Sequence, residues 1–144
     1  MGYRIAADLI VLVHFTWILF MLYGFFRTAF ATFLYYCQNR KEKAKKFFER
    51  WVFRTVHVLG IFYVGLLTIL REFCPLTIVE NTLRARYDTS LTYPGSFMIY
   101  HIERFVYPGV SPMLIITGTV IVAAFTLLMF VIRPPAKIKR LFTR

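Results

Sequence analysis

Long apolar runs alternate with short charged segments along this chain. Three runs, at residues 5–26, 52–70 and 110–132, are long enough to cross a bilayer. Because a helix rises 1.5 Å per residue, about 20 residues span a hydrocarbon core of about 30 Å. The pattern therefore predicts an all-α integral membrane protein with three transmembrane helices. The first run is too long for a secretory signal, although residues 29–31 (Ala-Phe-Ala) resemble a cleavage site.

Aromatic residues and prolines mark the expected helix ends. Residues 27–36 are rich in Phe and Tyr and are expected to continue the first helix into the headgroup zone. Pro75 is expected to stop the second helix near Cys74, because proline cannot continue a helix. The Arg-Pro-Pro sequence at residues 133–135 is expected to end the third helix in the same way.

The segment between the second and third spans, residues 71–108, is predicted to be more than a simple loop. Its Tyr-Pro-Gly sequence at residues 93–95 is typical of a turn. Residues 96–108 mix aromatic and aliphatic side chains with charged ones, which predicts a short amphipathic piece lying in the membrane interface. Thr77 or Glu80 is expected to cap a turn that follows the second span.

The charge distribution predicts an orientation. Residues 37–54 carry seven Lys and Arg against two acidic residues, and residues 133–144 carry five against none. Residues 71–108 carry four of each sign. The positive-inside rule then places the basic connection and the C-terminus in the cytoplasm, and the N-terminus and residues 71–108 outside. Cys37 and Cys74 would lie on opposite sides of the membrane and are not expected to pair.

Composition agrees with a single membrane domain over residues 1–144. Hydrophobic residues make up 58% of the chain, above the roughly 45–50% of soluble domains. The net charge of +11 is expected from membrane insertion alone, so we do not expect nucleic acid binding. The basic cytoplasmic surface is expected to attract anionic lipid or an acidic subunit.

Two histidines stand inside predicted spans. His14 lies ten residues after Arg4, and His57 lies fourteen residues before Arg71, which gives depths of roughly 15 and 21 Å below one boundary. Helical bundles hold haem b between histidines at similar depth on neighbouring spans. The predicted cofactor site is therefore haem b between His14 and His57. The alternatives are another metal, hydrogen-bonded packing, a quinone contact and a proton path.

The polar residues after the second span are the other candidates. We expect an ion-paired structural lid made by Arg71, Glu72, Cys74, Glu80, Asn81, Arg84 and His101. Paired charges are the kind tolerated where water is scarce. Asp8 is expected to be a solvated carboxylate near a helix start, with an ion pair to an arginine such as Arg71 as the alternative. Copper bound by Cys74, Met98 and His101 is a further alternative.

The string Cys-Pro-Leu-Thr-Ile-Val-Glu-Asn at residues 74–81, together with His14 and His57, resembles a known family. It is the small bacterial membrane-protein family catalogued as domain of unknown function 2784. The resemblance covers most of the chain and implies the three-span topology and a bacterial cytoplasmic membrane. It implies no function. The basic connection at residues 37–54 looks longer than the short turn of the family, which suggests an added cytoplasmic contact surface.

The sequence carries no hydrolase triad, phosphate-cradling glycine loop or zinc motif, so we do not expect an enzyme that works alone. The expected function is a non-catalytic accessory or anchor subunit of a larger bacterial membrane complex, in electron transport and with haem b. One alternative is a cofactor-free structural or assembly subunit that stabilises a partner membrane protein. The other is a small membrane oxidoreductase that uses a quinone.

Overall fold

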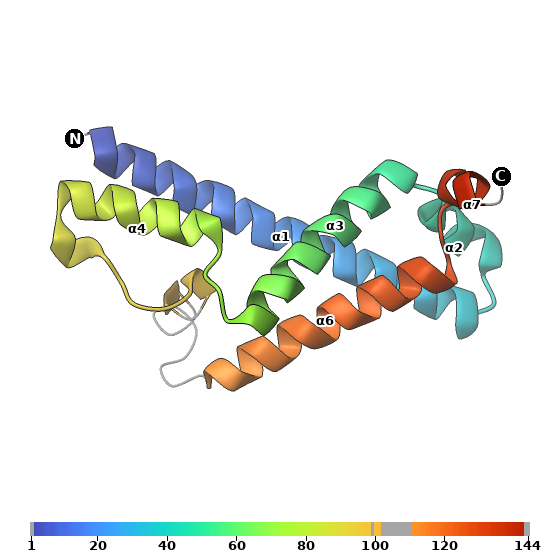
Figure 1. Cartoon of the computed structure of the whole chain (residues 1–144). Coiled ribbons are helices and arrows are strands. Elements are labelled where there is room, and N and C mark those ends of the chain that lie inside the picture. The colour runs from blue at the N-terminus through green and yellow to red at the C-terminus, as the bar shows by residue number, and fades with distance from the viewer. Residues whose placement is uncertain (1, 99, 102–110, 143–144) are drawn as a thin grey trace. The chain divides into compact units, whose positions relative to one another are not determined.

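The structure, a computed structural model, describes residues 2–98, 100, 101 and 111–142 (Figure 1). Its main helices are, in order, α1 (Gly2–Tyr36), α2 (Lys41–Phe48), α3 (Trp51–Leu70), α4 (Pro75–Tyr87), the short 3-10 helix η1 (Thr89–Leu91), α6 (Pro112–Ile132) and α7 (Ala136–Phe142). Helices α1, α3 and α6 are long and apolar enough to cross a membrane. For the residues that the structure describes, the prediction of an all-helical chain with three helices able to cross a membrane is confirmed.

The chain forms two compact units that share the three long helices. The first unit comprises Met1–Ile18 and Leu66–Val120, and the second comprises Leu19–Gly65 and Ile121–Arg144. The first unit therefore holds the N-terminal half of α1 together with α4 and η1. The second unit holds α2 and α7 with the remaining half of α1, most of α3 and the C-terminal half of α6.

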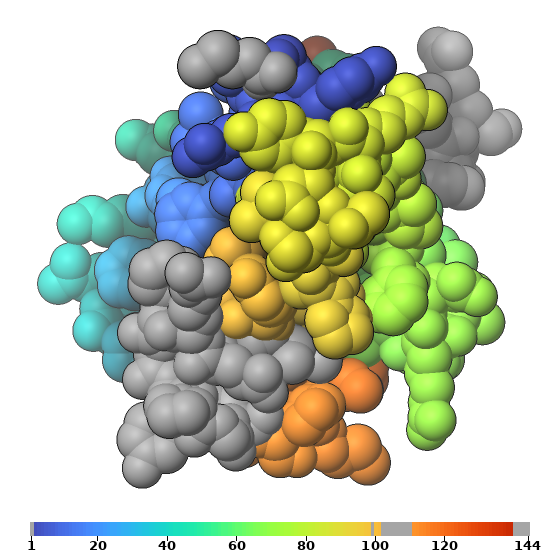
Figure 2. Space-filling model, turned by 90° about the vertical axis from the view of Figure 1, so that its left-hand side faces the viewer, coloured from blue at the N-terminus to red at the C-terminus, as the bar shows by residue number. Residues whose placement is uncertain are grey.

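In the first unit, α4 lies along the N-terminal half of α1 (Figure 1). Figure 2 shows the same pairing from the side, with the yellow-green surface of α4 and the residues that follow it next to the blue start of α1. Ala7 on α1 and Thr77 and Glu80 on α4 are buried. The buried side of α4 is thus largely polar, which makes the contacts of those polar groups decisive for this unit.

The second unit has a hydrophobic cluster where its long helices end. Ala44, Phe47 and Phe48 of α2 pack with Ala31 of α1 and Met129 of α6. The spacing of the three α2 residues places them on one face of the helix, and the lysines of α2 are exposed. Burial of this apolar stripe holds α2 against the ends of α1 and α6.

The end of α3 agrees with the predicted span of residues 52–70, but the residue that stops the helix differs from the prediction. The helix stops at Leu70, and Arg71 adopts a left-handed conformation with φ of 58°. The Glu72 N–H donates to the Leu67 carbonyl at 2.9 Å, a bond that commonly closes a helix before a left-handed residue. Pro75 begins α4 instead of stopping α3, because the first residue of a helix needs no N–H donor. The prediction for Pro75 was wrong.

The start of α4 also differs from the prediction. Cys74 is its N-cap residue and makes no side-chain capping hydrogen bond. The N–H groups of Thr77 and Ile78 donate to the Cys74 carbonyl at 2.8 and 3.2 Å. The expectation that Thr77 or Glu80 would cap this turn with its side chain was therefore wrong, and a helix of 13 residues stands where only a turn was expected.

Other predicted boundaries are confirmed. Helix α1 continues to Tyr36, and α6 ends at Ile132, just before the two prolines. The predicted turn bends at Gly95, whose φ of 96° suits a residue without a side chain. The amphipathic piece predicted over residues 96–108 can be compared only in part, since residues 99 and 102–110 lie outside the described residues.

Candidate functional site

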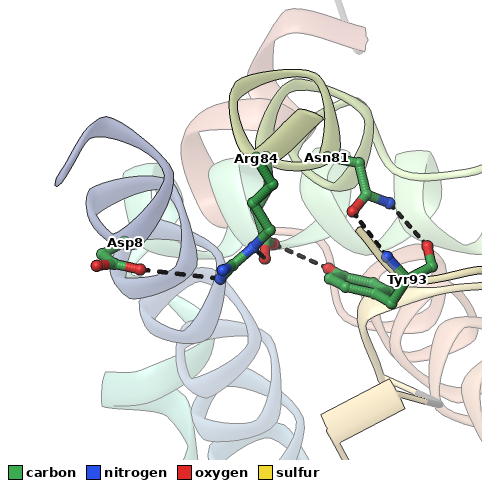
Figure 3. A network of polar contacts seen from close by, with 5 residues as sticks. Asp8, Asn81, Arg84 and Tyr93 are labelled. Carbon is green, nitrogen blue, oxygen red and sulfur yellow. Dashed lines mark hydrogen bonds and ion pairs between the residues drawn. The ribbon is translucent and has the colours of Figure 1, made fainter. Parts of the chain in front are cut away.

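A fully buried carboxylate is bound by two side chains in the first unit (Figure 3). Glu80 on α4 is 0% exposed. Its Oε1 accepts a hydrogen bond from Nε of Arg84, one helical turn later, at 2.8 Å. Its Oε2 accepts from the Tyr93 hydroxyl at 2.9 Å. Because both oxygens are bonded and one donor is cationic, the buried charge is compensated.

Further contacts join this carboxylate site to its surroundings (Figure 3). The Asn81 side-chain amide donates to the Tyr93 carbonyl at 3.0 Å, and the Tyr93 N–H donates to Asn81 Oδ1 at 3.3 Å. Nη2 of Arg84 lies 3.8 Å from Oδ1 of Asp8 on α1. The Asp8 side chain is 61% exposed, so this ion pair contributes little by itself. Together these contacts tie α1, α4 and the segment after η1.

The environment of Tyr93 changes its acidity. Burial, followed by the hydrogen bond to Glu80 and the charge of that carboxylate, raises the pKa of the Tyr93 phenol. An ionised phenol would face the Glu80 carboxylate and repel it. Tyr93 therefore stays a protonated donor to Glu80.

His14 lies in an aromatic cluster in the same unit. Its side chain is buried, and its ring stacks on Phe97 with centroids 4.1 Å apart. Phe97 also contacts His101 at 4.2 Å, and Tyr93 stacks on Tyr100 at 4.1 Å. Among the described residues, Nδ1 of His14 has no hydrogen-bond partner. The structure thus brings His14 and His101, two of the predicted site residues, together with Tyr93.

His57 lies in the second unit and fills a gap left by a glycine. Its side chain is 2% exposed, and its Nε2 donates to the Met21 carbonyl at 2.9 Å. A Cβ atom added to Gly24 would lie only 2.1 Å from the His57 ring. The Phe53 ring lies parallel to His57, with centroids 6.1 Å apart. His57 is therefore held between α1 and α3 by shape and by one hydrogen bond.

Arg54 is a buried cation. From the sequence it was predicted only to be one of the basic residues of the connection at residues 37–54. The residue is 3% exposed, and its guanidinium donates to the Phe48 carbonyl at 3.1 Å, the Met129 carbonyl at 3.2 Å and the Arg133 carbonyl. It also lies over the rings of Phe48 and Phe130 at 5.1 and 5.2 Å. Carbonyls at helix C-termini carry partial negative charge, so Arg54 stabilises the ends of α2 and α6.

The structure separates the predicted lid residues into three groups, one of which is His101 in the aromatic cluster. Glu80, Asn81 and Arg84 join the network, and Asp8 pairs with Arg84 instead of with Arg71. Arg71 and Glu72 are exposed at the end of α3, and Cys74 is partly buried as the N-cap of α4. Within residues 2–98, 100, 101 and 111–142, no three His, Cys, Asp or Glu side chains come together as metal ligands.

The site residues predicted from the sequence did not include Tyr93, Arg54 or Gly24. Tyr93 stood in a turn signal, which gave no sign that its hydroxyl would meet Glu80 across thirteen residues. Arg54 did leave a signal, because a cation inside the apolar run at residues 52–70 is expensive unless it has partners. The role of Gly24 becomes visible only in the structure, where the His57 ring occupies the space that a side chain at this position would need.

Comparison with known proteins gives a family and no function. No curated protein and no solved structure matches the chain. Residues 4–135 match the family described as "Protein of Unknown function (DUF2784)". The match includes all three spans, the Glu80 network, His14, His57 and Arg54. The chain therefore belongs to the DUF2784 family.

Proposed function

We propose that this chain is a non-catalytic accessory or anchor subunit of a larger bacterial membrane complex. One observation carries this proposal: the chain covers little of its own membrane-spanning surface. In the most apolar window of each span, only 17% of α1, 28% of α3 and 17% of α6 is buried within the chain. The rest must face lipid tails or the helices of other subunits.

The buried polar groups support a structural role. Glu80 is bound by Tyr93 and Arg84, and Arg54 and His57 donate to backbone carbonyls. Each of these groups therefore holds helices or segments of the chain together. Buried polar groups bonded in this way make a helical scaffold rigid, which suits a subunit that stabilises a partner.

The redox version of the proposal places haem b on His14 and His57. To bind iron through Nε2, His57 would have to release the Met21 carbonyl and turn away from the space over Gly24. These contacts favour the cofactor-free version, in which the chain stabilises or helps to assemble its partner. A reduced minus oxidised absorption spectrum separates the two versions. A b-type α band that disappears in His57→Ala supports the redox version, and a flat spectrum supports the cofactor-free one.

We further propose that the chain lies in the bacterial cytoplasmic membrane with its N-terminus outside and its C-terminus inside. The basic residues of α2 and of residues 133–144 support this orientation through the positive-inside rule. The Glu80 network then lies on the outer side, where α4 and the segment after it cover the start of α1.

The mass of the extracted complex tests the accessory role. Native membranes would be extracted with a mild detergent at natural expression levels, and the protein content of the particle that contains this chain would be measured. We expect the 17.0 kDa chain together with at least one other protein in a fixed ratio. Overexpression serves as the control. It should produce more copies of this chain than of its partner, so the excess chain should be extracted without the partner. A natural particle that holds only copies of this chain would overturn the proposal.

A further inference from the structure

The exposed surface of α2 is strongly basic. Arg40, Lys41, Lys43, Lys45, Lys46 and Arg50 are exposed, and we call these six residues the basic face. The only acidic residues between positions 37 and 54 are Glu42 and Glu49. Among the described residues, Lys43, Lys45 and Lys46 have no ion-pair partner, since Arg84 makes the ion pairs with Asp8 and Glu80. The basic face therefore carries positive charge that the described part of the chain leaves uncompensated.

The fold fixes where this charge lies along the spans. Ala44, Phe47 and Phe48 pack α2 against Ala31 near the end of α1 and Met129 near the end of α6. Residues 37–50 also connect the end of α1 directly to the start of α3. All three spans end beside α2 in this unit, so the basic face lies at the level where a bilayer changes from tails to headgroups.

Aromatic side chains mark the same level independently. The Lys137 Nζ atom lies 5.0 Å from the centre of the Trp51 ring, at the start of α3. The guanidinium of Arg133 lies 4.0 Å from the Tyr35 ring, and Lys41 Nζ lies 6.0 Å from the same ring. Trp and Tyr are enriched at the headgroup level. Cations stacked on these rings are therefore held where phosphates of the bilayer lie.

We propose that the basic face binds the phosphate groups of anionic phospholipids, such as phosphatidylglycerol, in the leaflet where α2 lies. The ligand follows from charge and position together, because lipid phosphates are the anions present at this depth all around the spans. Juxtamembrane lysines are attracted to anionic leaflets in this way. The inference needs the three spans and does not depend on the accessory role, so either proposal can fail alone.

Spin-labelled lipids provide the test. The full chain would be reconstituted in phosphatidylcholine bilayers, and the association of spin-labelled phosphatidylglycerol relative to spin-labelled phosphatidylcholine would be measured. The test variant is Lys43→Gln/Lys45→Gln/Lys46→Gln, in which glutamine preserves helix propensity. The matched control is Arg4→Gln/Arg71→Gln/Arg86→Gln, which removes the same charge from three exposed residues of the first unit.

We expect the wild type to prefer phosphatidylglycerol by about threefold or more at low salt. The lysine variant should lower the ratio toward about one, and the control variant should keep most of the preference. The preference should weaken as ionic strength rises, because exposed charges are screened. A wild type with no preference, or equal losses in both variants, would overturn the proposal. A wild type with no preference would instead favour an acidic protein as the partner of the basic face.

Discussion

Single polar side chains in this protein are buried with specific partners. Glu80 accepts hydrogen bonds from Tyr93 and Arg84, while the His57 ring occupies the space beside Gly24 and donates to a backbone carbonyl. A buried polar group that loses its partner costs free energy, because it has already given up water. Substitutions at these positions should therefore affect stability more than substitutions at exposed positions of the same residue type.

Tyr93→Phe should lower the free energy of unfolding of the detergent-solubilised protein by about 1 kcal/mol at pH 7, because Glu80 loses one donor. The effect should depend on pH. The pKa of Tyr93 is raised in the folded state, so its contribution is fully present below the unfolded-state pKa of about 10 and is lost as pH rises above it. The stability difference between wild type and Tyr93→Phe should therefore shrink above about pH 10.

Tyr87→Phe is the control for this effect, because Tyr87 is 43% exposed and should change stability by less than about 0.5 kcal/mol. Thermal unfolding followed by circular dichroism between pH 7 and pH 11 measures all three proteins. A wild-type advantage over Tyr93→Phe that stays constant across this range would show that the phenol does not sense Glu80 as described.

Gly24→Ala should destabilise the protein by about 2–3 kcal/mol. The new methyl group would lie 2.1 Å from the His57 ring, so α1, α3 or the ring must shift. Gly118→Ala is the matched control, because a Cβ atom at that helical glycine meets nothing within 4 Å. It should be neutral or stabilising by up to about 1 kcal/mol.

A second substitution distinguishes a steric clash from a general effect on α1. In the His57→Ala background the ring is absent, so adding Gly24→Ala should cost much less than it does in the wild type. Unfolding midpoints of the four proteins in this double-mutant cycle give the coupling free energy. Additive effects would mean that Gly24 and His57 do not contact each other.

At the scale of elements, hydrophobic pattern predicted the spans and missed α4. The three long helices could be found because each is a long run of predominantly apolar residues. Helix α4 buries Thr77 and Glu80, so its inner face is polar and shows no apolar period. The end of α3 at Leu70 agrees with the predicted span, but its cause was not predicted. Arg71, and no glycine or proline, adopts the left-handed conformation there.

Arg54 determines how α2, α3 and α6 are held in the second unit. Arg54→Met keeps the length of the side chain and removes the donors to the Phe48, Met129 and Arg133 carbonyls. We expect a loss of about 2–3 kcal/mol in the free energy of unfolding, since buried carbonyls are left without partners. The α2 segment should also open more often, so trypsin should cut between residues 40 and 50 faster than in the wild type.

Arg50→Met is the control for this prediction, since Arg50 is exposed. It removes one cation from the same segment and should leave the unfolding free energy within about 0.5 kcal/mol. Because it deletes a trypsin site, cleavage is compared at Lys43, Lys45 and Lys46 only. Equal cleavage and stability in the two variants would contradict the role of Arg54.

At the scale of the whole molecule, the two native cysteines test the proposed orientation. Cys37 is exposed after α1 and Cys74 is partly accessible before α4. In spheroplasts, a membrane-impermeant maleimide should label Cys74 and spare Cys37. In inverted vesicles the pattern should reverse. Cys37→Ser and Cys74→Ser identify each labelled site, and labelling of Cys37 from outside would contradict the orientation.

The three long apolar helices could be predicted from sequence, because they depend on local apolar length. Their sidedness stays a prediction from charge counts. The candidate site could be predicted only in part. Glu80, Asn81 and Arg84 were recognised as a polar group, but their link to Tyr93 depends on a turn geometry that sequence does not encode locally. The packing of His57 against Gly24 is likewise a contact between distant residues.

The proposed accessory role requires that other membrane proteins cover part of the spans. Site-specific photo-cross-linking in native membranes tests it most directly, with the photoreactive residue placed at Leu12, Leu59 or Val131. These positions are 61%, 63% and 76% exposed, one on each span. We expect at least one position to give a single protein adduct of defined mass while others give only lipid adducts. Lipid adducts alone at all three positions, and at neighbouring exposed positions on every face, would contradict the account.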